Sequence, residues 1–303
     1  MCNTKIFIVT VNVKPENMKT NKLIAKYDQE LLADDDESLD FTQFQILNIL
    51  DEAGWEIFAT IAPTVEKGSQ QPSQDLYASL NSEKFYFEYH EDNGHASIRS
   101  KPSQPRFAKD LKLNNFLHLP HYSVKEVVVL EKIFAGLGYI AKVSLNGQEM
   151  CCKCVKPDTI KAVQREYECL QKVAMSKVAP GVRTPKLLGF VTDDSGDVVG
   201  ILETFIPHKQ NLSKIEGGIN GIPEAQRREW ARQIKDTMET LHNIDVIWGD
   251  AKAQNVLIHS ETNACYLVDF EGSWTNGWVD ENLKETRQGD EQGLKRIIQY
   301  LGL

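Results

Sequence analysis

Residues 246–258 have the sequence V-I-W-G-D-A-K-A-Q-N-V-L-I, and residues 265–271 have the sequence C-Y-L-V-D-F-E. Two short β-forming runs, residues 256–259 and 265–268, are separated by Ser, Glu, Thr, Asn and Ala, which favour a turn. The pattern predicts a β-hairpin. That hairpin would bring the polar residues before its first strand close to the aspartate that ends its second strand.

Four polar side chains around this hairpin have the spacing of a phosphoryl-transfer centre. A carboxylate at Asp250 can orient a hydroxyl nucleophile and accept its proton, and a cation at Lys252 can neutralise charge on the transferred group. Asn255 and Asp269 offer the oxygen ligands that Mg²⁺ prefers. We therefore predict catalytic roles for Asp250 and Lys252 and metal-binding roles for Asn255 and Asp269. The alternative interpretation is a polar rim on an ordinary hairpin.

These residues resemble the catalytic and metal-binding loops of the protein-kinase-like superfamily, whose usual patterns are H-R-D-L-K-x-x-N and D-F-G. Here the patterns appear as W-G-D-A-K-A-Q-N and D-F-E, with G-W-V-D at residues 277–280, and are particularly similar to kinase-like proteins of filamentous fungi. The resemblance covers about residues 127–303. It implies an α+β, bilobal protein-kinase-like fold that uses ATP and Mg²⁺ to phosphorylate a hydroxyl acceptor.

A glycine-containing loop is expected near the start of this region. Residues 127–133 are strongly β-forming, and residues 134–143 read F-A-G-L-G-Y-I-A-K-V, which fits G-x-G-x-x-A-x-V. Glycines let a hairpin backbone come close to phosphate oxygens. The resemblance therefore places Gly136, Gly138 and Val143 at the nucleotide.

The next expected strand, M-C-C-K-C-V at residues 150–155, resembles the family's V-A-I-K. Strand alternation puts Cys151 and Lys153 on one face. In the family that face lines the nucleotide pocket, so the resemblance places Cys151 at the base and Lys153 at the α- and β-phosphates. Lys156, on the opposite face, is the less favoured candidate.

A helix predicted at about residues 157–178 should supply the carboxylate that holds Lys153. At about 100° per residue, Glu166 lies about 60° from Val163 and borders the apolar face, whereas Glu168 points nearly opposite. The sequence therefore favours Glu166 over Glu168.

Further along the chain, residues 202–206 resemble the family's hinge, whose backbone binds the adenine edge, and this places Glu203 and Phe205 at the nucleotide. A long helix is predicted at residues 223–241, with its apolar side in the core. We interpret His242, at the end of this helix, as structural rather than catalytic.

Several residues depart from the family's patterns. Trp248-Gly249 stands where His-Arg is usual, so no cation beside the base can sense a phosphorylated activation loop. Glu271 replaces the glycine of D-F-G and, with Gly249-Asp250, resembles aminoglycoside- and choline-kinase-like enzymes. Ala141 replaces a glycine of the phosphate-binding loop. Residues 271–303 are too few for peptide-docking helices, so we expect a minimal C-terminal lobe, in which Asp290 can accept backbone N–H bonds from the catalytic loop.

The composition excludes several functional classes. Of 303 residues, 41% are hydrophobic and 25% charged, which is ordinary for a globular protein. No apolar run approaches the roughly 20 residues that cross a bilayer, and no signal peptide is evident, so we expect no membrane association. A net charge of −9 argues against nucleic-acid binding, which needs clustered Lys and Arg.

The chain has six cysteines. Cys151, Cys152 and Cys154 crowd one predicted strand and no matching Cys/His pair occurs elsewhere, so no zinc site is expected. A reduced cytoplasmic or nuclear environment follows.

The length allows two domains. We interpret residues 1–122 as a partly loop-rich α+β extension of unknown role, and residues 123–303 as the kinase-like domain, with lobes at about 123–206 and 207–303. In the extension the sequence predicts four features: a strand at 6–13, a helix at 41–53 with Phe44, Ile46, Leu47 and Leu50 inward, a strand at 55–61, and a hairpin at 85–100 around Asn93-Gly94.

These residues favour an ATP-dependent phosphotransferase that acts on protein Ser/Thr hydroxyls. Lys252 favours the Ser/Thr-kinase side, whereas Gly249, Glu271 and the short C-terminal lobe favour a small-molecule kinase. A pseudokinase that serves as a binding module is the third possibility.

Overall fold

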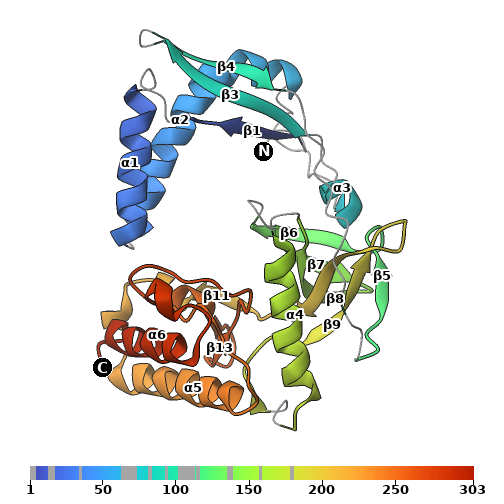
Figure 1. Cartoon of the computed structure of the whole chain (residues 1–303), viewed down its shortest axis with the longest axis vertical. Coiled ribbons are helices and arrows are strands. Elements are labelled where there is room, and N and C mark those ends of the chain that lie inside the picture. The colour runs from blue at the N-terminus through green and yellow to red at the C-terminus, as the bar shows by residue number, and fades with distance from the viewer. Residues whose placement is uncertain are drawn as a thin grey trace. The chain divides into compact units, whose positions relative to one another are not determined.

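The structure is a computed structural model of the chain. It describes residues 5–12, 18–33, 36–62, 74–80, 84–92, 95–101, 113, 117–134, 139–156, 159–177 and 181–303. The chain divides into two compact units (Figure 1). One contains Met1–Pro72 and Ala78–Pro105, and the other contains Ser73–Tyr77 and Arg106–Leu303.

The first unit combines two helices with a three-stranded sheet. The helices are α1 (Met18–Ala33) and α2 (Asp36–Ile61), and the sheet has the order β1 (Ile6–Thr10), β3 (Lys84–Asp92), β4 (His95–Lys101) (Figure 1). β1 pairs parallel with β3, and β3 pairs antiparallel with β4. Phe87, Tyr89 and Ile98 form the buried core, against which side chains of α2 pack. The predicted β3–β4 hairpin is confirmed, although its Asn-Gly turn lies outside the described residues.

The helix α2 corrects two predictions for this unit. The structure has one helix from Asp36 to Ile61, where we expected a helix followed by a strand at 55–61. Gly54 does not end the helix: it permits close packing, since a Cβ there would overlap the ring of Phe58 and lie 2.6 Å from Cδ1 of Ile98. Phe44 and Leu47 are not inward but 59% and 54% exposed, because the buried face of α2 is the side that meets the sheet.

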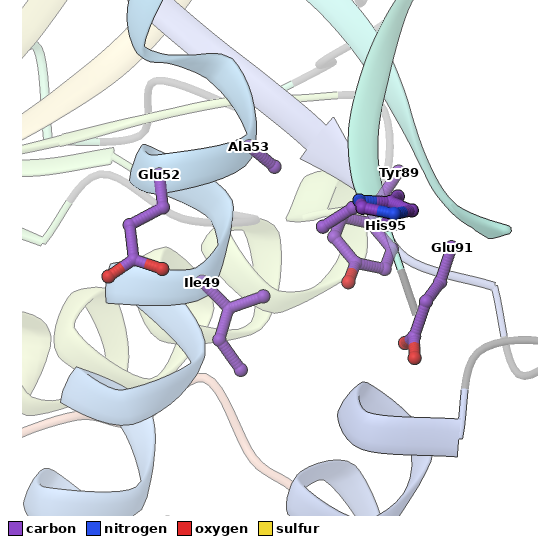
Figure 2. Close-up of a pocket in the computed structure, with 7 residues that line it drawn as sticks. Ile49, Glu52, Ala53, Tyr89, Glu91 and His95 are labelled. Carbon is purple, nitrogen blue, oxygen red and sulfur yellow. The ribbon is translucent and has the colours of Figure 1, made fainter. Parts of the chain in front are cut away.

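A cavity of about 250 Å³ lies between α2 and the β3–β4 hairpin. Figure 2 shows Tyr89, Glu91 and His95 of the hairpin on one side, and side chains of α2, among them Ile49 and Glu52, on the other. Burial, together with the neighbouring Glu91 carboxylate, raises the pKa of Tyr89. None of the predicted site residues lines this cavity.

The second unit begins with a seven-stranded sheet. Its order is β2 (Gln74–Asp75), β6 (Val128–Phe134), β7 (Tyr139–Leu145), β8 (Gln148–Cys154), β10 (Val198–Thr204), β9 (Leu187–Thr192), β5 (His121–Ser123). The short helix α3 (Leu76–Leu80) follows β2. Through β2, residues 73–77 pack with the second unit; that residues 1–122 form a functionally separate extension stays a prediction.

Helix α4 (Ile160–Met175) packs on β9 and β10 of this sheet. Its apolar face repeats at helical spacing, which is why one side of it is buried. Val163, Tyr167, Leu170 and Val173 are all buried and join a core that also contains Phe190 of β9. α4 is thereby held against the strands that lead into the C-terminal part of the unit.

The C-terminal part consists of helices α5 (Glu224–His242) and α6 (Arg287–Tyr300), which lie side by side (Figure 1), and a three-stranded sheet. That sheet has the order β11 (His208–Asn211), β12 (Val256–His259), β13 (Cys265–Leu267). The predicted hairpin at residues 256–268 and the inward side of the helix at 223–241 are confirmed: Trp230, Ile234, Met238 and Leu241 are buried. Across the described residues, no helix is both long and apolar enough to span a bilayer.

Candidate active site

Asp250, Lys252 and Thr275 form a polar cluster in which each side chain contacts the other two. The Asp250 carboxyl group is 2.7 Å from Lys252 Nζ through Oδ2, and Thr275 donates a hydrogen bond of 2.9 Å to its Oδ1. Lys252 Nζ in turn donates to Thr275 Oγ1 at 2.9 Å. The structure therefore brings the predicted base and cation together. It adds Thr275, which lies 25 residues after Asp250 and belongs to no motif that the sequence offered.

Asn255 joins this cluster to the hairpin. Its Nδ2 atom donates to the backbone oxygen of Asp250 at 3.0 Å, and its own backbone oxygen accepts from Val268 at 3.0 Å. Asp269 follows directly and adopts a positive φ of 66°, a conformation that is uncommon for non-glycine residues and concentrates at functional sites. The hairpin thus places Asn255 beside the strand end that carries Asp269.

Asp290 of α6 supports the loop before Asp250 from within the core. It is 1% exposed and accepts 2.8 Å hydrogen bonds from the backbone N–H groups of Trp248 and Gly249. His242 Nε2 is 2.7 Å from Asp290 Oδ2. The predicted backbone contacts of Asp290 are confirmed, and His242 contacts the aspartate that holds the loop.

Lys153 of β8 is surrounded by three carboxylates. Its Nζ atom pairs with Glu166 of α4, and lies 3.3 Å from Asp269 Oδ1 and 3.4 Å from Glu271 Oε1. Lys153 and Glu166 are both buried. Glu168 lies on the exposed side of α4 and accepts a hydrogen bond from Gln164 instead. The structure therefore brings Lys153, Glu166 and Asp269 together from three distant segments.

Burial and charge act in opposite directions on this cluster. Burial alone would lower the pKa of Lys153, but the neighbouring carboxylates of Glu166, Asp269 and Glu271 raise it well above its usual value. Burial raises the pKa of Glu166 to about 7, although the Lys153 ammonium acts the other way. Lys153 thus remains charged among several acidic groups.

The carboxylate oxygens of Glu166, Asp269 and Glu271 lie within 4.8 Å of one another. Glu166 contacts Lys153 and the N–H of Phe270, which leaves Asp269 and Glu271 to offer the oxygen ligands that Mg²⁺ prefers. Asp269, whose metal-binding role stays a prediction, belongs to this group. Glu271 is an additional candidate ligand that the departure from D-F-G could have indicated.

Glu203 contributes a buried carboxyl group. It is paired across the sheet with Cys151 of β8, so both side chains share the face of Lys153. Glu203 is 2% exposed, and its Oε1 atom has no hydrogen-bond partner in the described part of the chain. Glu203 is the next-to-last residue of β10, and its contact with a nucleotide stays a prediction. Phe205, the first residue after β10, does follow the strand, and Lys142 lies over its ring at 4.7 Å.

Glu203→Gln is expected to stabilise the protein increasingly as pH rises. Burial, followed by the neighbouring Glu166 charge, raises the pKa of Glu203 well above its ordinary 4.5. The folded state therefore binds this proton more tightly than the unfolded state. The stability that the proton contributes is fully present below pH 4.5 and is lost as pH rises through the folded pKa. Thermal unfolding between pH 4.5 and 8 should show the advantage of the variant growing with pH. Glu168→Gln, on the exposed face of α4, should show no such trend; parallel curves for both variants would contradict this account.

The register between β7 and β8 corrects the position of Val143. Val143 is paired with Met150, whereas Ile140 is paired with Lys153. Directly opposed residues share a face, so Ile140 and not Val143 accompanies Lys153. Counting from the glycines could not reveal this, because the face depends on pairing. Gly136 and Gly138 lie outside the described residues.

A buried Lys–Glu pair between a sheet and a helix, next to an Asp/Lys/Asn loop and a β-hairpin that ends in Asp, is the arrangement of a protein kinase. Residues 135–281 match the family model described as a protein kinase domain. The C-terminal half of the chain therefore contains a protein kinase domain, and such a domain indicates a phosphotransferase. Over 128 residues the chain is 29% identical to the serine/threonine-protein kinase PKH1 of Saccharomyces cerevisiae. The alignment covers 41% of this chain and 16% of that protein.

Proposed function

We propose that the chain transfers the γ-phosphoryl group of ATP to a Ser or Thr hydroxyl of a protein. The observation that carries this proposal is the convergence of Lys153, Glu166 and Asp269. Lys153 Nζ pairs with Glu166 and lies 3.3 Å from Asp269 Oδ1. Phosphoryl transfer depends mainly on positioning and on charge stabilisation. A cation and a metal-binding carboxylate held side by side meet both requirements.

In this proposal each residue has a defined role. Lys153 binds the α- and β-phosphates, and Glu166 holds Lys153 in place. Asp250 orients the acceptor hydroxyl and accepts its proton. Lys252 and Thr275 contact this carboxylate, and Lys252 would neutralise charge on the transferred group. Gly136, Gly138, Glu203 and Phe205 remain predicted nucleotide contacts, and Cys151 a predicted base contact.

Asp269 and Asn255 would hold Mg²⁺, with Glu271 as a further oxygen donor. The Asn255 amide nitrogen is used by the Asp250 carbonyl, which leaves the amide oxygen for a metal. When bound, the ion would neutralise charge on the phosphate oxygens. The donor set contains only oxygen atoms, as Mg²⁺ requires.

A protein acceptor is favoured by Lys252 and by the likeness to a kinase named for serine and threonine. A small-molecule acceptor is the second candidate, because Gly249 and Glu271 resemble aminoglycoside- and choline-kinase-like enzymes. The proposal also includes a relationship to fungal kinase-like proteins, which W-G-D-A-K-A-Q-N resembles, and a reduced cytoplasmic or nuclear location.

Phosphoryl transfer from radiolabelled ATP distinguishes the two acceptor classes. Transfer of label to casein supports a protein acceptor, and transfer to choline or kanamycin supports a small-molecule acceptor.

Lys153→Met is expected to abolish the stabilisation of the protein by Mg-ATP. A ligand that binds the folded state raises the melting temperature, and the substitution removes the cation expected to bind the phosphates. Lys156→Met is the matched control, since Lys156 is the next lysine along the chain and was the alternative candidate. Wild type and Lys156→Met should show the same Mg-ATP-dependent shift. A wild-type melting temperature that Mg-ATP leaves unmoved would instead favour a pseudokinase.

A further inference from the structure

Arg165, which precedes Glu166 on α4, connects this helix to both functional loops. Its guanidinium donates to the backbone oxygens of Ile247 at 3.0 Å and Trp248 at 3.2 Å, and also to the backbone oxygen of Phe270. The first two carbonyls immediately precede Gly249-Asp250, and the third follows Asp269. One side chain therefore ties α4 to the catalytic loop and to the metal-binding segment.

Two glycines make room for this guanidinium. At Gly249, which has a φ of 95°, a Cβ would lie 2.5 Å from Nη2 of Arg165. At Gly272, which has a φ of 80°, a Cβ would lie 2.9 Å from Cδ of Arg165. The positive φ angles favour glycine at both positions. A side chain at either position would also overlap Arg165 and displace its guanidinium. The glycine that replaces the usual Arg before the catalytic Asp thus admits an Arg from another element.

Arg165 and Glu166 together hold both backbone polar groups of Phe270. Arg165 donates to its carbonyl oxygen, and Glu166 Oε1 accepts from its N–H at 3.3 Å. The other carboxyl oxygen of Glu166 contacts Lys153. A displacement of α4 would therefore disturb the lysine pair and the backbone next to Asp269 at the same time.

We propose that Arg165 is a positioning residue that latches α4 onto residues 247–248 and 270, so that the Lys153–Glu166 pair forms without phosphorylation of the chain. The latch rests on the proposed kinase function. From α4, Arg165 contacts the carbonyls of residues 247–248, whereas Asp290 holds N–H groups of the same loop. The backbone carbonyls and N–H groups of the loop are thus both bound by ionisable side chains.

Hydrogen exchange of the full chain, measured without nucleotide, tests the latch directly. In Arg165→Met, peptides covering residues 246–250 and 268–272 should exchange faster than in wild type. Lys172→Met is the matched control, because Lys172 is a cation on the same helix that donates to the backbone oxygen of Asp245 at 3.1 Å. It should leave both peptides unchanged. Unchanged exchange in Arg165→Met overturns the proposal.

Turnover gives the second readout. Arg165→Met should lower kcat by at least about tenfold, the change that corresponds to one charge-assisted hydrogen bond, whereas Lys172→Met should match wild type. Arg165→Lys keeps the charge but reaches fewer carbonyls, so its kcat and exchange should lie between those of wild type and Arg165→Met. If Arg165→Met does not fold, Arg165→Lys replaces it as the test variant. In that case, wild-type kcat and wild-type exchange in Arg165→Lys would overturn the latch.

Treatment of the wild type with a nonspecific protein phosphatase should leave kcat unchanged. A loss of turnover after this treatment would show that the pair needs phosphorylation and would overturn the latch. The failure of the proposed function looks different: wild type would then transfer label to no acceptor, while the exchange comparison would still decide whether Arg165 holds the two segments.

Discussion

Asp250→Asn is expected to lower the rate of phosphoryl transfer by about 10²–10⁴-fold, the usual contribution of a general base. The amide keeps the size of the side chain and can still accept from Thr275, but it cannot take the proton of the acceptor hydroxyl. Mg-ATP binding should remain, because Lys153 and Asp269 are unchanged. The measurement is label transfer from ATP at saturating acceptor, together with the Mg-ATP-dependent shift in melting temperature.

Asp236→Asn provides the matched control for Asp250→Asn. Asp236 lies exposed on α5, where it pairs with Arg232, and its substitution should leave transfer unchanged. His242→Ala would be a less suitable control, because His242 contacts the aspartate that holds the loop. Similar losses in Asp250→Asn and Asp236→Asn would exclude Asp250 as the base.

Asp290→Ala is expected to lower the free energy of unfolding by about 3 kcal/mol or more, since each buried polar group left without its partner costs about 1–3 kcal/mol. The substitution leaves His242 and the N–H groups of Trp248 and Gly249 without their acceptor inside the core. Buried polar groups without partners are costly. Urea unfolding followed by tryptophan fluorescence measures the change, since Trp248 lies beside the substituted residue.

Glu291→Ala tests whether the effect of Asp290→Ala is specific. Glu291 is the next residue of α6 but is exposed, and surface substitutions usually change stability by less than about 0.5 kcal/mol. If Asp290→Ala cost no more than Glu291→Ala, the aspartate would not be the internal support of the loop.

Much of the fold could be predicted where the determining contacts are close in sequence. The hairpin at residues 256–268 follows from β-forming runs on either side of a turn, and the buried side of α5 follows from helical spacing. The preference for Glu166 over Glu168 was also available from the helical angle, because both residues belong to one helix. The long α2 helix was predicted as a helix and a strand on either side of Gly54, whereas Gly54 lies inside one helix, where its lack of a side chain serves the packing of Phe58 and Ile98.

The candidate site was predictable in its residue types but not in its full set of contacts. Asp250, Lys252, Asn255 and Asp269 stand at short, recognisable spacings. Thr275 and Arg165 belong to no such spacing, although they contact the same loop. Side chains with one hydroxyl or one guanidinium occur throughout the chain, so only their position in space distinguishes these two.

The order of amino acids alone sets the local geometry: which residues form the hairpin, which face of each helix is apolar, and which acids and bases lie a few residues apart. Tertiary packing decides the rest, including Ile140 rather than Val143 across from Lys153, the burial of Glu203, and the reach of Arg165 over more than 80 residues of sequence to Ile247. The physical reason is that backbone periodicity acts over a few residues. Strand register and helix docking are determined by the burial of side chains from the whole unit.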